Sequence, residues 1–206
     1  MDTTVAAALL VVGPLLGVLG FYDTQLWRVW MLPRDEHLAL VDAHRRGWTM
    51  VNVGFTVATV LTAAGLLLLP APTAVEDVPR AVLAAGAVAY SIGGVLWCVV
   101  LGIRARTTPA LATMVATGTP TEPAETLLGA ALGGLFAGFA LATSLALVAI
   151  GVALAIGGGV AAPLAWLVAL AGALITAWFL AAGDIIPAVL YVPTLLVGLA
   201  LLAGWT

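Results

Sequence analysis

Long apolar stretches separated by short polar breaks run along the whole sequence. A helix rises about 1.5 Å per residue, so roughly 20 apolar residues cross a bilayer core of about 30 Å. Six stretches approach or exceed that length: residues 4–22, 48–69, 81–103, 127–156, 163–182 and 185–205. Lipid offers no hydrogen bonds to open backbone, so each stretch should be helical. We predict an all-α fold, a polytopic membrane helix bundle in which residues 1–206 form a single domain of six transmembrane helices.

Proline and glycine mark the breaks between these stretches. Pro70 ends the second stretch, and a glycine run that starts at Gly157 separates the fourth from the fifth, because both residue types interrupt helices. Between the fifth and sixth stretches, Gly183 suits the left-handed residue that closes a helix, and Asp184 suits the N-cap of the next one. We therefore expect a tight hairpin there.

The connection between the first two helices, residues 24–46, has a helical pattern of its own. Pro33 fits a first helical position, acidic side chains follow it, and basic side chains precede Gly47, which can close the helix. This pattern predicts an amphipathic interfacial helix along the membrane surface, with an ion pair between Asp42 and Arg46. Four of its side chains are candidates for contact with lipid headgroups or a partner: His37, His44, Arg45 and Arg46.

Composition supports lipid as the surrounding solvent. Of the 206 residues, 63% are hydrophobic and 8% are charged, whereas about 25% of the residues in a soluble domain are charged. The net charge of −3 and the lack of a dense basic patch argue against nucleic acid as a partner. The basic residues are all arginine, a bias typical of GC-rich prokaryotes, and the single cysteine, Cys98, can form no intrachain disulfide.

The arginines are distributed unevenly between the connections. Only Arg80 lies in the second connection. The other six lie in the first and third connections: Arg28, Arg34, Arg45, Arg46, Arg104 and Arg106. Positive connections stay on the cytoplasmic side, so we predict a multi-pass protein of the plasma membrane with both termini outside the cytoplasm. The N-terminal apolar stretch lacks a positive leading region, which favours a retained first helix over a cleaved signal.

Polar side chains form one stripe along the second predicted helix. They recur at spacings of three or four residues, which places them on one helical face: Thr49, Asn52, Thr56, Thr59 and Thr62. A side-chain amide in hydrocarbon must be hydrogen-bonded, so Asn52 should face protein or a wet cavity. Either the stripe bonds to neighbouring helices and its own backbone, or it lines a cavity for a ligand. The second interpretation gives a candidate ligand-binding set: Asn52, Thr56, Thr59, Tyr90, Ser91, Tyr191 and Thr194.

Glycines recur at close spacing on the fourth predicted helix: Gly129, Gly133, Gly134 and Gly138. Pairs of small residues separated by three others let two helix backbones approach closely. The pattern predicts a contact face for another helix. That helix belongs either to the same chain, to a second copy or to another membrane subunit.

Features that membrane enzymes and ion-coupled transporters commonly need are missing from the pattern. No predicted span has an ionisable side chain well inside the hydrocarbon. His37 and His44 are seven residues apart, about 10.5 Å along a helix, which is too far for both to bind one metal ion. We therefore assign no catalytic residue, no metal site and no cofactor.

The leading expectation is a non-enzymatic integral membrane protein that binds or passes a small uncharged or amphiphilic molecule in an intramembrane cavity beside Asn52. The first alternative is an accessory or scaffold subunit of a larger membrane complex. The second is an interfacial lipid-modifying enzyme that uses His37 and His44 with nearby acids. Those acids are Asp35, Glu36 and Asp42.

Overall fold

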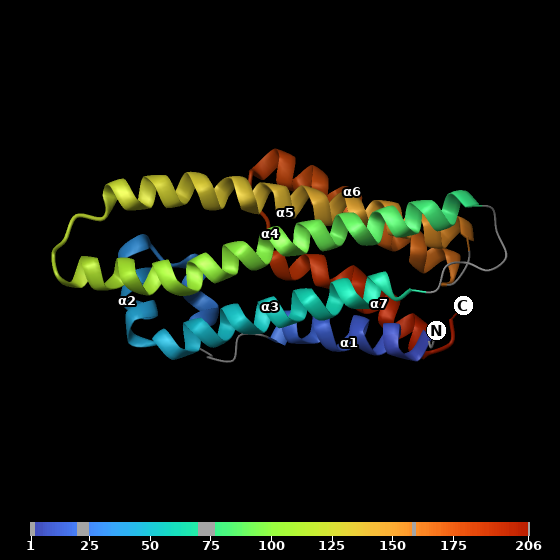
Figure 1. The fold of residues 1–206 in the computed structure, drawn as a ribbon, viewed down its shortest axis with the longest axis horizontal. Coiled ribbons are helices and arrows are strands. Elements are labelled where there is room, and N and C mark those ends of the chain that lie inside the picture. The colour runs from blue at the N-terminus through green and yellow to red at the C-terminus, as the bar shows by residue number, and fades with distance from the viewer. Residues whose placement is uncertain (1–2, 20–24, 70–76, 158–159, 206) are drawn as a thin grey trace.

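In the computed structural model, every regular element of the described residues is a helix (Figure 1). The described residues are 3–19, 25–69, 77–157 and 160–205. In chain order the elements are α1 (Thr3–Leu19), the 3₁₀ helix η1 (Leu26–Met31), α2 (Arg34–Ala43), α3 (Arg45–Leu67), α4 (Asp77–Ala116), α5 (Glu122–Gly157), α6 (Ala162–Ala182), the 3₁₀ helix η2 (Pro187–Leu190) and α7 (Tyr191–Leu202). The predicted all-α class is confirmed.

The long helices lie side by side along one axis and form an elongated bundle (Figure 1). At one end, η1 and α2 lie beside the last turns of α4, and the two ends of the chain lie at the opposite end. We call η1, α2 and residues 104–116 of α4 the cap. Chain direction alternates between successive long helices, so the first and third connections meet at the cap end, as the sequence predicts.

Within the described part of the chain, four helices are long and apolar enough to cross a membrane: α3, α4, α5 and α6. The first predicted span corresponds to α1, which has 17 residues, and its predicted end at residue 22 lies outside the described residues. The sixth predicted span, 185–205, is shorter in the structure. Pro187 begins a single 3₁₀ turn there, and the α-helix proper starts only at Tyr191.

Helix α4 is longer than the sequence predicts. The predicted span ends at residue 103, where charged residues begin, but the helix continues through Pro109 to Ala116. Arg104 and Arg106 therefore belong to the helix and not to a connecting loop. Charge ends an apolar run, yet it does not end a helix, because arginine is itself a good helix former. The extension also packs against α2, whose Leu38 is buried.

The interfacial helix ends earlier than predicted. His44 has φ −123° and ψ 39°, which ends α2 at Ala43, and α3 begins at the next residue. Gly47 consequently lies inside α3 and closes no helix. The predicted ion pair between Asp42 and Arg46 is also wrong. The Asp42 carboxylate instead accepts a hydrogen bond from Nε of Arg45 at 2.9 Å, because the break at His44 changes the register of the side chains that follow.

The tight turn after α6 agrees in part with its prediction. Gly183 has φ 73°, and its N–H donates to the Phe179 carbonyl at 2.8 Å, so the left-handed end of α6 is confirmed. Asp184 does not cap the next helix, because two residues still separate it from η2. Its Oδ1 instead accepts the N–H of Ile185 at 2.8 Å.

Of the four glycines that the pattern singles out, one makes a close helix contact, and the closest backbone approaches occur at other glycines. A Cβ added at Gly172 of α6 would lie 2.6 Å from the carbonyl oxygen of Ser144 on α5, so these helices meet backbone to backbone. On α5, a Cβ at Gly138 would meet Leu96. The remaining three glycines of the predicted face have no atom within 4 Å among the described residues: Gly129, Gly133 and Gly134.

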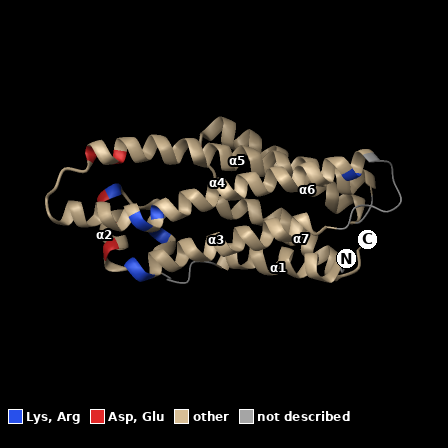
Figure 2. Ribbon diagram, viewed as in Figure 1, with Lys and Arg blue, Asp and Glu red and all other residues tan. Residues whose placement is uncertain are grey.

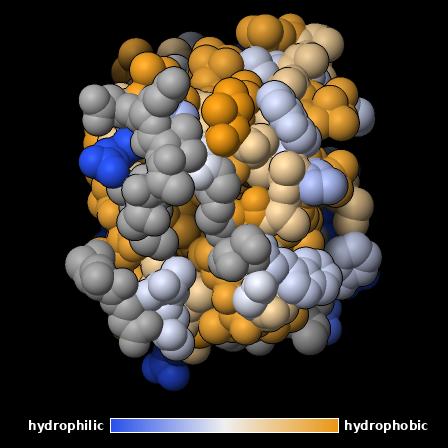
Figure 3. Space-filling model, turned by 90° about the vertical axis from the view of Figure 1, so that its right-hand side faces the viewer, coloured by the Kyte–Doolittle hydropathy of each residue, from blue (hydrophilic) through white to orange (hydrophobic). Residues whose placement is uncertain are grey.

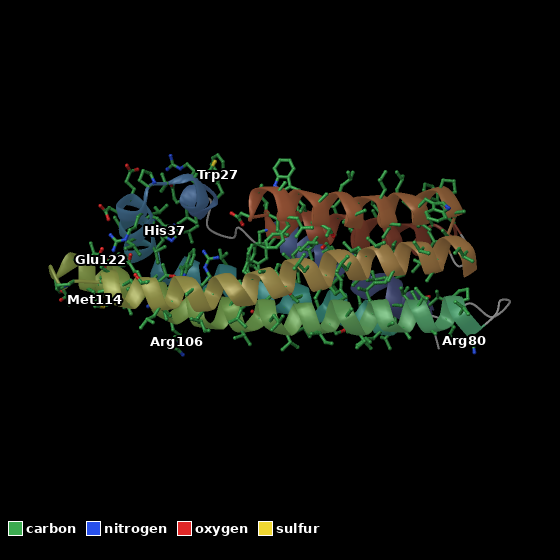
Figure 4. The ribbon with its side chains drawn as sticks, turned by 90° about the horizontal axis from the view of Figure 1, so that it is seen from above. Trp27, His37, Arg80, Arg106, Met114 and Glu122 are labelled. Atoms are coloured by element: carbon green, nitrogen blue, oxygen red, sulfur yellow. The ribbon has the colours of Figure 1, made fainter. Side chains whose placement is uncertain are left out.

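Charge is concentrated at one end of the bundle. The arginines of the first and third connections lie at the cap end, and Arg80 lies near the opposite end (Figures 2 and 4). Figure 3 looks onto that opposite end, where most described side chains are apolar or of intermediate hydropathy. Among the described residues, the two ends of the molecule therefore differ in charge.

Candidate functional site

A cavity of about 810 Å³ lies at the junction between the cap and the bundle. This volume falls in the range of sites that hold small organic ligands. Five segments form its wall: η1, α3, α4, α5 and residues 184–188, which run from the turn after α6 into η2. The lining residues are Trp27, Met31, Val51, Asn52, Phe55, Trp97, Leu101, Arg104, Phe136, Asp184, Ile185, Ile186, Pro187 and Ala188.

Helix α4 supplies one continuous strip of this wall. Trp97, Leu101 and Arg104 follow each other at spacings of four and three residues and so share one helical face. About 10 Å of helix rise separates the first from the last. Helix α3 lies alongside in fixed register, because Nε1 of Trp48 donates to the Arg104 carbonyl at 3.0 Å.

The wall changes from polar to aromatic away from the cap. Arg104 lies at the cap end of the α4 strip, and on α3 Asn52 is one turn nearer the cap than Phe55. Farther into the bundle the wall is aromatic: Trp97 contacts Phe136, with ring centroids 5.8 Å apart. The walls supplied by α3 and α4 are therefore polar toward the cap and aromatic toward the bundle, while Trp27 and Met31 of η1 add apolar contacts on the cap side.

Arg104 is positioned by Trp48. The Trp48 side chain is fully buried, and the Arg104 guanidinium carbon lies 5.6 Å from the indole centroid. Stacking of a cation on an indole face is favourable. The carboxylate of Asp184, on the same cavity wall, is close enough to interact electrostatically with Arg104.

Two further polar groups lie in the cavity wall. Nδ2 of Asn52 donates to the Trp48 carbonyl at 2.7 Å, so part of the amide is used within α3. The Trp97 side chain is 2% exposed, and its Nε1–H has no hydrogen-bond acceptor among the described residues. A buried indole N–H normally has a partner. The Tyr191 side chain lies close enough to interact with this indole, although the contact does not meet strict hydrogen-bond geometry.

The polar stripe on α3 is mostly bonded to its own helix. Each of its side chains donates to the carbonyl four residues earlier, as the structural interpretation expects: Thr49, Asn52, Thr56, Thr59 and Thr62. Asn52 alone among these five lines the cavity.

The other predicted ligand-binding residues lie away from the cavity wall. The hydroxyls of Thr59 and Tyr191 are 2.7 Å apart and join α3 to α7. Thr194 donates to the Tyr191 carbonyl and Ser91 to the Ala87 carbonyl, each at 2.8 Å. Tyr90 is buried at 2% exposure. These side chains contribute to helix packing in the bundle.

Three of the four predicted headgroup contacts are engaged within the protein. Nδ1 of His37 is 3.0 Å from the Val29 carbonyl, and its ring meets the Trp48 ring edge-on at 5.8 Å. Burial lowers the pKa of His37, while the Val29 carbonyl acts in the opposite direction. His44 forms the α2–α3 junction, Arg45 also bonds Thr113 on α4, and Arg46 is exposed.

An ion pair that the sequence analysis missed joins α2 to the start of α5. Nε of Arg34 donates to Oε2 of Glu125 at 2.6 Å, and Nη2 donates to Oε1 of the same carboxylate. Nη2 also donates to Oγ1 of Thr121, and Nη1 donates to the carboxylate of Asp35. We call this group the clasp. The Arg34 guanidinium holds the pKa of Glu125 below its usual value. These partners are 91 residues apart, so no local sequence pattern could reveal them.

No group of three or more His, Cys, Asp or Glu side chains in the described part of the chain could hold a metal ion. Searches against protein-family models, curated proteins and solved structures give no match for this chain. The cavity is therefore the feature from which a function can be argued.

Proposed function

We propose that this chain is an integral protein of the plasma membrane that binds a small amphiphilic molecule in the cavity between cap and bundle. The observation that carries the proposal is the polarity of the cavity wall, with Arg104 and Asn52 toward the cap and Trp97 and Phe136 toward the bundle. In this proposal α1 and the η2–α7 segment complete six spans, the cap is cytoplasmic, and both termini lie outside.

The outer surface of α6 supports residence in a membrane. Trp166, Leu170, Leu174 and Trp178 recur every fourth residue, and each side chain is more than half exposed. A continuous exposed apolar ridge is unfavourable in water but suits lipid.

The cavity wall supports binding without catalysis. Aromatic rings provide a large apolar contact surface for a hydrocarbon chain, while the few polar groups at the cap end would orient the head of the ligand. Nδ1 of His37, which an interfacial enzyme would use, is instead directed to the Val29 carbonyl.

Filling the cavity tests this proposal. Ala188→Trp adds an indole to the wall, so it should abolish binding of a dodecyl-chain amphiphile to purified protein, measured by native mass spectrometry. Ala130→Trp places the same ring on an exposed position of α5 and is the control. Equal binding by both variants and the wild type would refute the cavity as the site.

A second candidate function is that of a subunit in a larger assembly. Gly129, Gly133 and Gly134 leave an open face on α5 that no described residue covers, and such faces suit close helix contacts. Gly133→Ile should then convert a larger species into a monomer in mild detergent, as measured by light scattering. A wild type that is monomeric at all concentrations would rule this out.

A further inference from the structure

The proposed cavity contains two side chains of opposite charge. Among the described residues that line it, Arg104 and Asp184 are the charged ones, and the other polar groups are the amide of Asn52 and the indole N–H groups of Trp27 and Trp97. The two charged residues come from different elements, α4 and the turn after α6, so the fold brings them to one cavity. Two opposite charges on an apolar wall suggest that the head of the ligand is itself charged.

Arg104 suits an anionic group. A guanidinium has five N–H donors in one plane and binds phosphate or carboxylate through two of them. The Arg104 guanidinium carbon lies 5.6 Å from the Trp48 indole centroid, so this cation–π contact holds the charge at the cavity wall, where a ligand anion could reach it.

Asp184 suits a cationic group. It lies in the turn fixed by the left-handed Gly183, and its side chain is exposed. Oδ1 accepts the N–H of Ile185 at 2.8 Å. A carboxylate can accept about four hydrogen bonds, so this contact leaves capacity for an ammonium group. The same carboxylate would repel a head that carried only negative charge.

We infer that the ligand is a zwitterionic amphiphile, with a phosphate-type anion at Arg104, a cationic amine at Asp184 and a hydrocarbon chain against Leu101, Trp97 and Phe136. This inference rests on the proposed function. It names the chemical class of the head, which the shape of the cavity alone does not define.

The test compares three probes with the same chain: dodecylphosphocholine, dodecyl phosphate and an uncharged dodecyl ether. Each is titrated against the full-length protein in a neutral sugar detergent and measured by native mass spectrometry. The wild type should bind dodecylphosphocholine most tightly. Arg104→Gln should weaken both phosphate probes about tenfold, the size expected for a lost charge-assisted hydrogen bond, without affecting the ether.

Asp184→Asn should weaken dodecylphosphocholine severalfold and strengthen dodecyl phosphate. Two matched controls remove the same charges elsewhere. The first control is Arg106→Gln: Arg106 is two residues from Arg104, and it points away from the side of α4 on which the cap residue Trp27 lies (Figure 4). The second control is Glu122→Gln, at the start of α5. Neither control should change binding. Arg104→Lys, which keeps the charge, should recover part of the phosphate affinity, which separates loss of charge from misfolding.

The outcomes separate this inference from the proposed function. Equal binding of all three probes, unchanged in both variants, would overturn the zwitterionic head while leaving an amphiphile-binding cavity. Free phosphocholine that bound as tightly as the dodecyl form would overturn the amphiphile and indicate a water-soluble zwitterion. If no dodecyl probe bound, the proposed function would fail together with the inference.

Discussion

Replacing Trp48 by phenylalanine should destabilise the protein by about 2–3 kcal/mol. The substitution removes the hydrogen bond from Nε1 to the Arg104 carbonyl, about 1 kcal/mol. It also weakens the stacking with the Arg104 guanidinium, up to about 1 kcal/mol. Because Trp48 is fully buried, the smaller ring leaves unfilled volume that costs about another 1 kcal/mol.

The measurement is the free energy of unfolding in mixed micelles, obtained by titration with a denaturing detergent. Trp178→Phe is the matched control, because this indole is 67% exposed on the outer face of α6 and should change stability by less than about 0.5 kcal/mol. A Trp48→Phe variant as stable as the control would refute the conclusion that Trp48 joins α3 to α4 at the cavity.

Three further predictions concern the cavity wall, the clasp and the cap. Asn52→Leu should weaken amphiphile binding severalfold in native mass spectrometry, whereas Thr56→Val, which lies off the cavity wall, should not; equal effects would contradict the assignment of the wall. Because Arg34 lowers the pKa of Glu125, the clasp stabilises the fold above the ordinary value of 4.5, and this stability is lost as the pH falls through the folded pKa. Thermal melting at a series of acidic pH values should show this loss of stability in the wild type. If Arg34→Gln lost as much stability over the same pH range, the clasp would be excluded as the cause. Burial lowers the pKa of His37, so the stability that neutral His37 gives the fold is complete above pH 6.5 and declines as the pH falls below that value. The melting temperature of His37→Gln should therefore change less with pH below 6.5 than that of the wild type, and equal changes in the two proteins would refute this role of His37.

The sequence predicts the helices well because apolar runs reflect a physical requirement of burial or lipid contact. It fails at the end of α4, since charge marks the limit of an apolar run but not of a helix, and the extension to Ala116 depends on packing against α2. Likewise, the break at His44 lies inside a pattern that is locally helical. Tertiary contacts decide both features.

The cavity could be predicted only in small part. Asn52 was identified because an amide in an apolar stretch needs a partner, and it does line the wall. Its neighbours on the wall come from five segments, and ordinary apolar residues such as Phe136 and Ile185 give no signal of their position in space. The sequence does contain one further signal: Trp97, Leu101 and Arg104 share a helical face, which places the arginine on the same side as two buried residues.

The most direct test is the structure of the full-length protein purified in lipid nanodiscs, determined by electron cryomicroscopy. We predict elongated density in the cavity, with its head at Arg104 and its chain against Trp97 and Phe136. A cavity that is closed by its own side chains, with Phe136 and Ile185 in contact and no added density, would contradict amphiphile binding at this site.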